Sequence, residues 1–407
     1  MLHKEVFMDA QNLRKFHARH YFHSVGHGLF YSFEIADHET KKTELLFVYD
    51  CGTNSQKHFL RSEIKSFENR HGEKNPIDVL VLSRLDYNHF LGLMSLLEGR
   101  ESGDMVIIPH LTDVEKTYHL ILHNQIQDAE YLEFIQNPKI FMNKFFKKII
   151  LVSKAERPMM FNPSSVFPAQ EKFELVSSTT DQAMIDDNSY LRTNLGWIFY
   201  FYLSTPEQPI LKQIEEEFYS LGFSQKSIED NLHNSVTIEK MKEIFSRHQW
   251  TEHESNLVCV HGPSSNKHCS PTGFWYARRS FHFLEHHLAN KKWRSLGGKE
   301  FCVLTGSMNL FKNWGSLRDK LQKISERISI FTIPHHGERE HWNDAIVRDV
   351  DPDAWVVSSR LWSLLIPNHK VLSSVKHESR GGEICHVHEF RNMAVERIFV
   401  LKDLKET

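Results

Sequence analysis

The chain has 407 residues, which is enough for two or three domains or for one large α/β unit. Hydrophobic residues make up 40% of it and charged residues 25%, so a disordered chain and a small disulfide-stapled scaffold are excluded. The formal net charge is −3, and a chain without a strong positive field cannot act mainly by non-specific phosphate binding.

Cysteine usage and hydropathy bear on the cellular compartment. The five cysteines are widely spaced and form no C-x-x-C pair, which favours reduced thiols over disulfides or a cysteine-based zinc site. The N-terminal residues Met1–Ala10 carry charges and no apolar core, so no signal peptide is expected. The most apolar stretch, Trp197–Leu203, is too short to span a bilayer. We therefore expect a cytoplasmic protein that does not associate with a membrane.

The N-terminal part of the chain predicts alternating strands and helices. Apolar residues at helical spacing predict helices at Gln56–Arg70 and around Leu93–Leu97. Apolar runs predict strands on either side of Gly26–Gly28 within Tyr21–Ile35, and at Leu45–Tyr49, Ile77–Leu82 and Met105–Pro109. This alternation is typical of an α/β layered architecture.

Two helical blocks interrupt the strands that follow. They cover about residues 113–148 and 206–248. Further strands are expected at Ile149–Val152, Trp197–Leu203, Asn256–Val260, Glu300–Leu304, Ile328–Ile333, Ala354–Val357 and Val395–Leu401. We expect a single domain, residues 1–407, that carries the two blocks as helical insertions.

Four loops at strand ends occur in an informative order. They are His23–Phe30 with the later Tyr49–Gly52, then Val81–Leu93, then Val303–Ser307 and finally Ile333–Gly337. In this order they resemble the metallo-β-lactamase-fold superfamily, and within it the branch of the hydrolase domain of the competence protein ComEC. The resemblance covers nearly the whole chain. It implies an α/β fold of the metallo-β-lactamase type, an αββα four-layer sandwich with helical insertions.

The family pattern implies a dinuclear metal centre. The family reads S-H-x-D-x-D-H-x-x-G in the second of these loops, L-T-G-D in the third and P-H-H-G in the fourth. Those side chains hold two divalent cations that share a water molecule. Imidazole and carboxylate ligands suit zinc, manganese or iron, and the metals lower the pKa of the shared water so that it attacks as hydroxide.

This chain departs from the family pattern at three ligand positions. Arg84 stands where the family has its first histidine, Asn88 where it has the second aspartate of the loop, and Ser307 where it has the bridging aspartate. Two carboxylates are therefore missing, and a permanently protonated guanidinium occupies a ligand position. The charge balance favours an empty or reorganised site over an intact dinuclear centre.

Asp86, His89 and His335 remain from the ligand set that the resemblance implies. Arg84 is two residues from Asp86, so the two side chains are expected to form an ion pair that balances the pocket without a metal. The alternative is a single zinc or manganese ion held by Asp86, His89 and His335, with water as the fourth ligand.

Several neighbouring residues have two interpretations. Asp50 is expected to hydrogen-bond the adjacent turn, with a catalytic role as the alternative, and Gly26 and Gly28 are expected to provide tight backbone geometry. His336 is expected to support the site rather than act in it. His369 either lies at the pocket edge or matches the position of a pocket-edge histidine by chance, since the chain has 27 histidines.

One local basic run is interleaved with aromatic residues. Its basic members are Arg278, Arg279, Lys291, Lys292 and Arg294. Such a run could grip a nucleic-acid strand, but it also fits the solvated face of an amphipathic helix.

Two functions from different classes follow. The first is a catalytically degenerate protein that acts as a binding or regulatory subunit with a protein partner. The openings V-G-x-G-L-F-Y and Y-D-C-G resemble those of proteins from bacterial anti-phage defence loci, which implies a defence complex. The second is a metal-dependent hydrolase, a phosphodiesterase or nuclease, with a single metal ion. Arg84, Asn88 and Ser307 favour the first.

Overall fold

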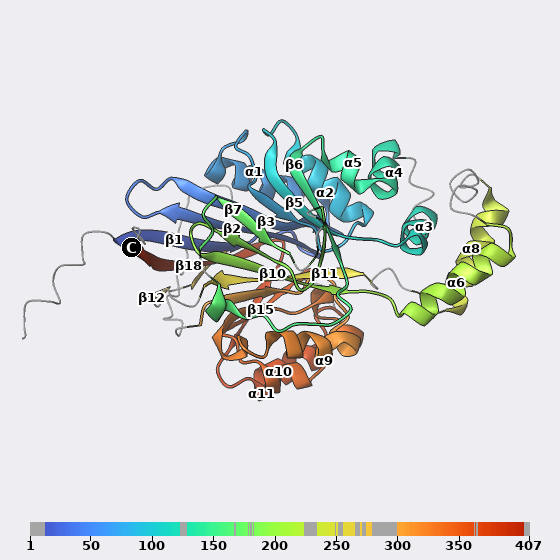
Figure 1. Cartoon of the computed structure of the whole chain (residues 1–407). Coiled ribbons are helices and arrows are strands. Elements are labelled where there is room, and N and C mark those ends of the chain that lie inside the picture. Colours follow the sequence, from blue (N-terminus) through green and yellow to red (C-terminus); the bar gives the residue numbers. More distant parts are fainter. Residues whose placement is uncertain are drawn as a thin grey trace, which may run out of the picture.

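The computed structural model describes residues 13–122, 128–166, 168–177, 179, 181, 183–223, 234–248, 250, 255–264, 269–270, 274–278, 299–361, 363 and 365–402. It is a mixed α/β structure with two β-sheets in the middle and helices outside them (Figure 1). The α/β class expected from the sequence is confirmed.

The first sheet has ten strands, antiparallel from β18 to β3 and parallel from β3 to β8. In spatial order they are β12 (Cys269–Ser270), β18 (Arg391–Lys402), β1 (Leu13–Phe22), β2 (Gly28–Asp37), β3 (Thr43–Thr53), β4 (Val79–Val81), β5 (Gly103–Pro109), β6 (Phe146–Ser153) and β8 (Met184–Asp186), and β13 (Phe274–Arg278) also pairs with β18.

The second sheet has eight strands and the same division into an antiparallel and a parallel half. In spatial order they are β17 (Glu383–Val387), β16 (Ala354–Ser358), β15 (Ile328–Thr332), β14 (Phe301–Leu304), β11 (Asn256–Pro263), β10 (Trp197–Ser204), β9 (Tyr190–Thr193) and β7 (Phe173–Val176). Every strand expected from the sequence overlaps one of these strands.

Helices cover the outer face of each sheet. The first sheet is covered by α1 (Lys57–His71), α2 (Tyr87–Leu97), α4 (Ala129–Gln136) and α5 (Pro138–Met142). The second is covered by α9 (Leu310–Leu321), α10 (Ala345–Asp349) and α11 (His369–Glu378). Short 3-10 turns are η2 (Pro163–Ser165), η3 (Ser325–Arg327), η4 (His335–Gly337) and η5 (Arg339–His341). The described chain is therefore layered helix, sheet, sheet, helix (Figure 1).

The strands are apolar on both faces because each sheet is buried on both sides. In β3, Phe47 and Tyr49 point into the core between the sheets. Leu46 and Val48, the alternate residues, pack against the helices over the first sheet. Successive side chains of a strand point to opposite faces of the sheet. A strand in a sheet that is covered on both faces must therefore carry apolar side chains on both.

A chain of buried polar groups joins the two sheets through the core. Trp197 Nε1 donates to His261 Nδ1 at 3.0 Å, so the proton of this imidazole is on Nε2, which donates to the Tyr31 hydroxyl at 2.9 Å. That hydroxyl donates to His20 Nδ1 at 2.7 Å. Burial lowers the pKa of His261 to about 3, which keeps its ring neutral.

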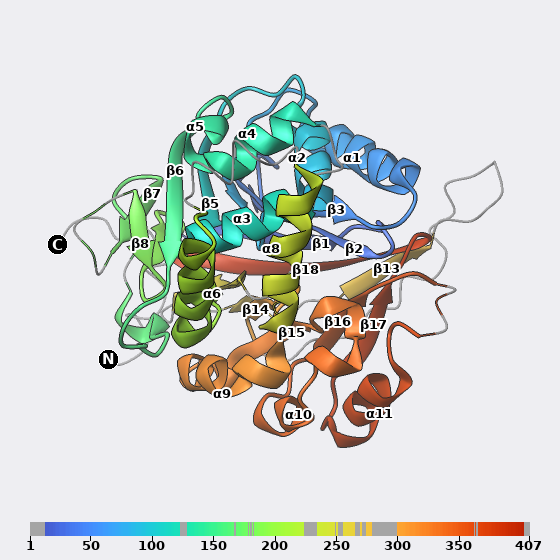
Figure 2. The same cartoon turned by 90° about the vertical axis from the view of Figure 1, so that its right-hand side faces the viewer.

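The two helical blocks of the sequence do not form one unit. In the first block, α4 and α5 join the layer over the first sheet, and Phe146–Lys148 belong to β6 rather than to a helix. The remaining helix, α3 (Asp113–Leu122), forms a small core with α6 (Gln208–Ser220) and α8 (Ser235–Arg247), while its Leu120 packs into the core under the helices of the first sheet. Figures 1 and 2 show α6 and α8 projecting from one side of the layered body.

Glycine allows α2 to lie directly against β3. A Cβ atom on Gly92 would lie 1.7 Å from the carbonyl oxygen of Cys51 in β3. Since that neighbour is backbone, no side-chain movement could relieve the clash. The close approach matters because the first turn of α2 carries Asn88 and His89.

Replacement of Gly92 by alanine is expected to lower the free energy of unfolding by about 1–3 kcal/mol, because α2 must move away from β3. The control is Gly315→Ala in α9, where an added Cβ has no atom within 4 Å. This control should raise the free energy of unfolding by about 0.5–1 kcal/mol. Urea unfolding measures both, and equal effects of the two substitutions would contradict the packing argument.

Candidate functional site

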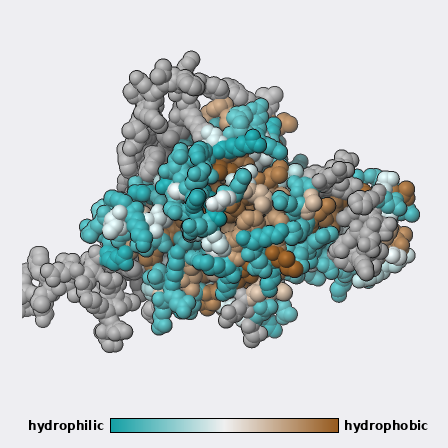
Figure 3. Space-filling view, turned by 90° about the horizontal axis from the view of Figure 1, so that it is seen from above, coloured by the Kyte–Doolittle hydropathy of each residue, from teal (hydrophilic) through white to brown (hydrophobic). Residues whose placement is uncertain are grey.

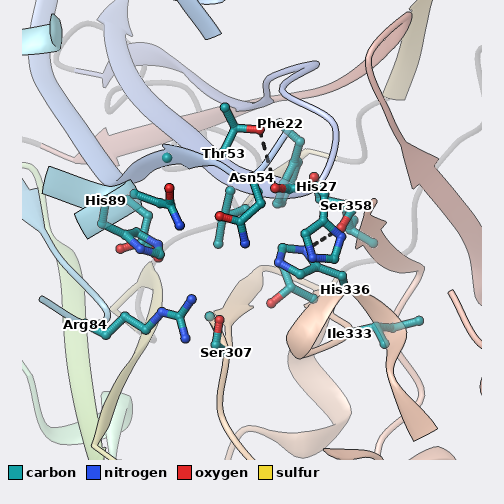
Figure 4. Close-up of a pocket in the computed structure, with 18 residues that line it drawn as sticks. Phe22, His27, Thr53, Asn54, Arg84, His89, Ser307, Ile333, His336 and Ser358 are labelled. Carbon is teal, nitrogen blue, oxygen red and sulfur yellow. Dashed lines mark hydrogen bonds and ion pairs between the residues drawn. The ribbon is translucent and has the colours of Figure 1, made fainter. Parts of the chain in front are cut away.

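A pocket opens where the carboxyl ends of parallel strands from both sheets meet (Figure 4). Such strand ends are where open α/β sheets usually bind ligands. The lining residues are Phe22, His27, Gly28, Leu29, Asp50, Gly52, Thr53, Asn54, Arg84, Asn88, His89, Gly306, Ser307, Thr332, Ile333, His336, Val356 and Ser358. The space that a water molecule can enter measures about 30 Å³, so only small groups fit in this conformation.

Asp86 organises one side of the pocket. It is the N-cap of α2, and its Oδ1 accepts hydrogen bonds from the backbone N–H groups of Asn88 at 2.9 Å and His89 at 3.0 Å. Its Oδ2 pairs with Nε of Arg84 and accepts from Nδ1 of His89 at 2.7 Å. The expected ion pair between Arg84 and Asp86 is therefore present, and both carboxylate oxygens are already engaged.

The charges in this group support one another. The Arg84 and Asp86 side chains are only 8% and 7% exposed. Burial opposes the charged form of Asp86, but Arg84 and His89 outweigh it and hold the pKa of Asp86 well below its usual value. Burial likewise lowers the pKa of His89, but the charges of Asp86 and Asp50 reverse the direction and raise it. The guanidinium and the imidazolium thus each have a buried carboxylate nearby.

Asp50 has the structural role expected from the sequence and also lines the pocket. Its Oδ1 accepts from the backbone N–H of Ser83 at 2.7 Å, which ties the end of β3 to the loop after β4. Its Oδ2 lies 3.7 Å from Nε2 of His89. Burial raises the pKa of Asp50 despite the opposing effects of His89 and Ser83. Its φ of 54° is in the left-handed region, a strained conformation for a non-glycine residue.

Histidines form the opposite wall. Nδ1 of His336 donates to the carbonyl of Ser358 at 2.7 Å, which leaves its Nε2 as an acceptor. The His27 ring lies beside it, with 3.9 Å between ring centroids (Figure 4). Burial, assisted by Arg360, lowers the pKa of His27 to about 4, and burial together with His27 holds that of His336 well below its usual value. Both rings are therefore neutral at pH 7.

The three residues that match the ligand set implied by the resemblance do not come together. Asp86 is joined to His89, whereas His335 directs Nδ1 to Oε2 of Glu338 at 2.8 Å. Of the three, only His89 lines the pocket. Among the described residues, two groups of side chains have all their possible ligand atoms within 4.8 Å of one another: His20, His261 and Cys302, and His335, Glu338 and His341. Neither group contains Asp86 or His89. The pocket residues therefore do not fit the metal centre that the resemblance implies.

The remaining sequence-predicted residues are placed as follows. Asn88 lines the pocket. Ser307 and Arg84 line it as well (Figure 4). His369 is exposed at the start of α11 and does not line the pocket. Gly26 has a φ of 75°, as a tight turn requires.

The basic run lies almost wholly outside the described residues. Arg278 ends β13 as a backbone position, while Arg279, Lys291, Lys292 and Arg294 are outside the described part of the chain. Nucleic-acid binding by this run stays a prediction.

Sequence reasoning missed part of the pocket wall. His27, Asn54 and Ser358 line the pocket without belonging to a ligand motif. The signal that could have found them is their position at strand ends: His27 directly precedes β2, Asn54 directly follows β3, and Ser358 is the last residue of β16.

No protein-family model matches this chain, and no curated protein matches its sequence significantly. In the described part of the chain, every helix is too short or too polar to cross a membrane. Functional inference therefore depends on the geometry of this chain.

Replacement of Arg84 by alanine is expected to lower the free energy of unfolding by about 1–4 kcal/mol, because the buried Asp86 loses its guanidinium partner. The control is Arg318→Ala, whose side chain is 54% exposed and pairs with exposed Asp319. That change should stay within about 0.5 kcal/mol. If the two variants unfold at the same denaturant concentration, the ion pair contributes nothing.

His89 is expected to give the protein a specific pH dependence. Because its folded pKa lies above the unfolded value of 6.5, protonated His89 stabilises the fold fully below that pH, and this stabilisation is lost as the pH rises through the folded pKa. The difference in unfolding free energy between wild type and His89→Gln should therefore be largest below about pH 6.5 and shrink as the pH rises above that value. His377→Gln removes an exposed imidazole as a control. A difference that stays constant over this range would refute the assignment.

Proposed function

We propose that this chain is a catalytically degenerate member of the metallo-β-lactamase-fold superfamily that acts as a binding or regulatory subunit. The observation that carries the proposal is the engagement of Asp86. Its two oxygens are taken up by the cap of α2, by Arg84 and by His89. A carboxylate in this position has no oxygen left for a metal ion unless the whole group reorganises.

The arrangement of layers supports the fold part of the proposal. Two sheets face each other across one core, and helices cover both outer faces. The four motif loops of the sequence contribute to one pocket at the strand ends. Both features are expected of the αββα sandwich of that superfamily.

The electrostatics of the pocket support the loss of hydrolytic chemistry. Two divalent cations would add four positive charges beside Arg84, and the only carboxylates named above that could balance them are Asp50 and Asp86. Asp86 is paired with Arg84, and Asn88 and Ser307 carry no charge. Placing uncompensated charge in such a buried site is strongly unfavourable.

The projecting helices supply a surface for a protein partner. Tyr219 on α6 and Val236 on α8 are 72% and 62% exposed. Figure 3 shows hydrophobic residues on the surface at this end of the molecule. Large apolar side chains exposed on an appended helical unit fit a docking surface better than an active-site cover. The resemblance to anti-phage defence proteins makes a defence complex the proposed setting.

The catalytic part of the proposal predicts metal content and activity. Protein purified without chelator should contain at most one zinc, manganese or iron ion per chain. It should hydrolyse bis(4-nitrophenyl) phosphate with zinc or manganese no faster than His89→Gln does, because the wild-type pocket lacks a metal-bound hydroxide. His377→Gln controls for loss of a surface histidine.

Two outcomes would overturn this part of the proposal. One is two tightly bound metal ions per chain. The other is metal-dependent hydrolysis that persists in His377→Gln and disappears in His89→Gln, and this outcome would establish the alternative, a phosphodiesterase or nuclease with a metal in the pocket.

The binding part predicts a partner that depends on α6 and α8. A Tyr219→Lys/Val236→Lys variant should lose a protein that co-purifies stoichiometrically with the wild-type chain from its native source. Lys212→Glu, at an exposed polar position of α6, should keep it. If the wild type carries no protein, the partner proposal fails, and nucleic acid in its place would point to the basic run.

A further inference from the structure

A second cluster of titratable side chains lies beside the pocket. It consists of His335, Glu338 and His341, whose donor atoms all lie within 4.8 Å of one another. Glu338 Oε2 is 2.8 Å from Nδ1 of His335 and 3.4 Å from Nδ1 of His341. The two imidazole rings are parallel, 3.9 Å apart at an angle of 7°. Both rings therefore present the same nitrogen to the same carboxylate oxygen.

The local backbone explains this convergence. His335 belongs to η4 and His341 to η5, and Glu338 lies between the two turns. His335 and His336 both have positive φ and Glu338 is extended, with φ −68° and ψ 137°, so two short turns separated by a bend, not one continuous 3-10 helix, bring the three side chains together. The positive φ of His335, 47°, turns the chain at the start of the motif. A sequence spacing of H-x-x-E-x-x-H thus becomes a cluster with three inward-facing donors.

We infer that His335, Glu338 and His341 form a site for one divalent transition-metal ion, with Zn²⁺ as the best match. Two imidazole nitrogens and one carboxylate oxygen are ligands that zinc prefers. Ligand atoms in a tetrahedral zinc site with bonds of about 2.0–2.1 Å lie about 3.4 Å apart. The Oε2–Nδ1 separations of 2.8 and 3.4 Å are close to that value. Because the two rings are parallel within 7°, one imidazole must rotate before both in-plane lone pairs point at the same ion.

The burial of the cluster fits a site that exchanges with solvent. The side chains of His335 and His341 are 10% and 13% exposed, and that of Glu338 is 28% exposed. A metal ion can therefore enter from the side of the carboxylate, and a water molecule can complete the coordination from the same side. The buried imidazole of His335 and the partly buried imidazole of His341 would hold two of the other positions.

The site would brace the pocket wall. His335 precedes His336, whose ring lines the pocket, and the backbone N–H of His335 donates to the carbonyl of Gly306 beside Ser307. A metal that links η4 to η5 would hold this segment in place. None of its ligands is Asp86 or His89, so the inference stands apart from the proposed loss of catalysis.

The test uses the full-length, tag-free chain with Co²⁺ or Zn²⁺ alone as the probe. Calorimetric titration should give one saturable site, and Co²⁺ should produce visible absorption bands of four-coordinate cobalt. His341→Ala and Glu338→Gln should each weaken binding at least about tenfold, because each removes a metal-ligand bond. Added Zn²⁺ should also raise the melting temperature of wild type and not of these variants.

Matched controls separate this site from other metal binding. His377→Ala, an exposed histidine, and His89→Gln, in the pocket, should bind the metal as tightly as wild type. Circular dichroism establishes whether each variant is folded. If His341→Ala does not fold, Glu338→Gln, the most conservative change, tests whether the cluster binds the metal. Absence of a saturable site, or unchanged affinity in Glu338→Gln, would show that the cluster is only a hydrogen-bonded ion pair.

Discussion

The carboxylate of Asp86 is the constraint on which the candidate site depends. One oxygen satisfies the first backbone N–H groups of α2, and the other pairs with Arg84 and His89. A buried charge is tolerated only when it is paired and hydrogen-bonded. The charged form of each of these three side chains therefore depends on the other two. The same pairing that stabilises the loop engages both carboxylate oxygens, and this supports the proposed loss of metal binding.

The two sheets bring that loop to the rest of the pocket. Gly92 lets α2 contact the backbone of β3, and this places His89 near Asp50 at the end of the strand. The second sheet contributes Ser307 and His336 from the segments that follow its parallel strands β14 and β15. The pocket is therefore a product of packing between sheets, and it depends on the shared aromatic core that holds them face to face.

The two adjacent histidines of the last motif have separate environments. His336 lines the pocket beside His27, whereas His335 faces Glu338 and His341. Both residues have positive φ, and this tight turn separates their rings by 6.0 Å. A motif that would supply one pocket ligand in the family thus serves two neighbouring sites here, one aromatic and neutral, the other rich in metal-binding donors.

The sequence by itself determined the α/β class, the positions of the strands that it predicted and the pairing of Arg84 with Asp86, whereas β7, β8, β9 and β17 were not predicted. The predicted features follow from local rules: apolar runs of strand length, and opposite charges two residues apart in one loop. Only the tertiary structure decided that α4 and α5 cover the first sheet while α3 joins α6 and α8, because helical periodicity shows that a face is apolar and not what it packs against. Tertiary structure also decided which histidine of the pair reaches the pocket, since two positive-φ residues redirect both side chains in a way that residue spacing does not encode.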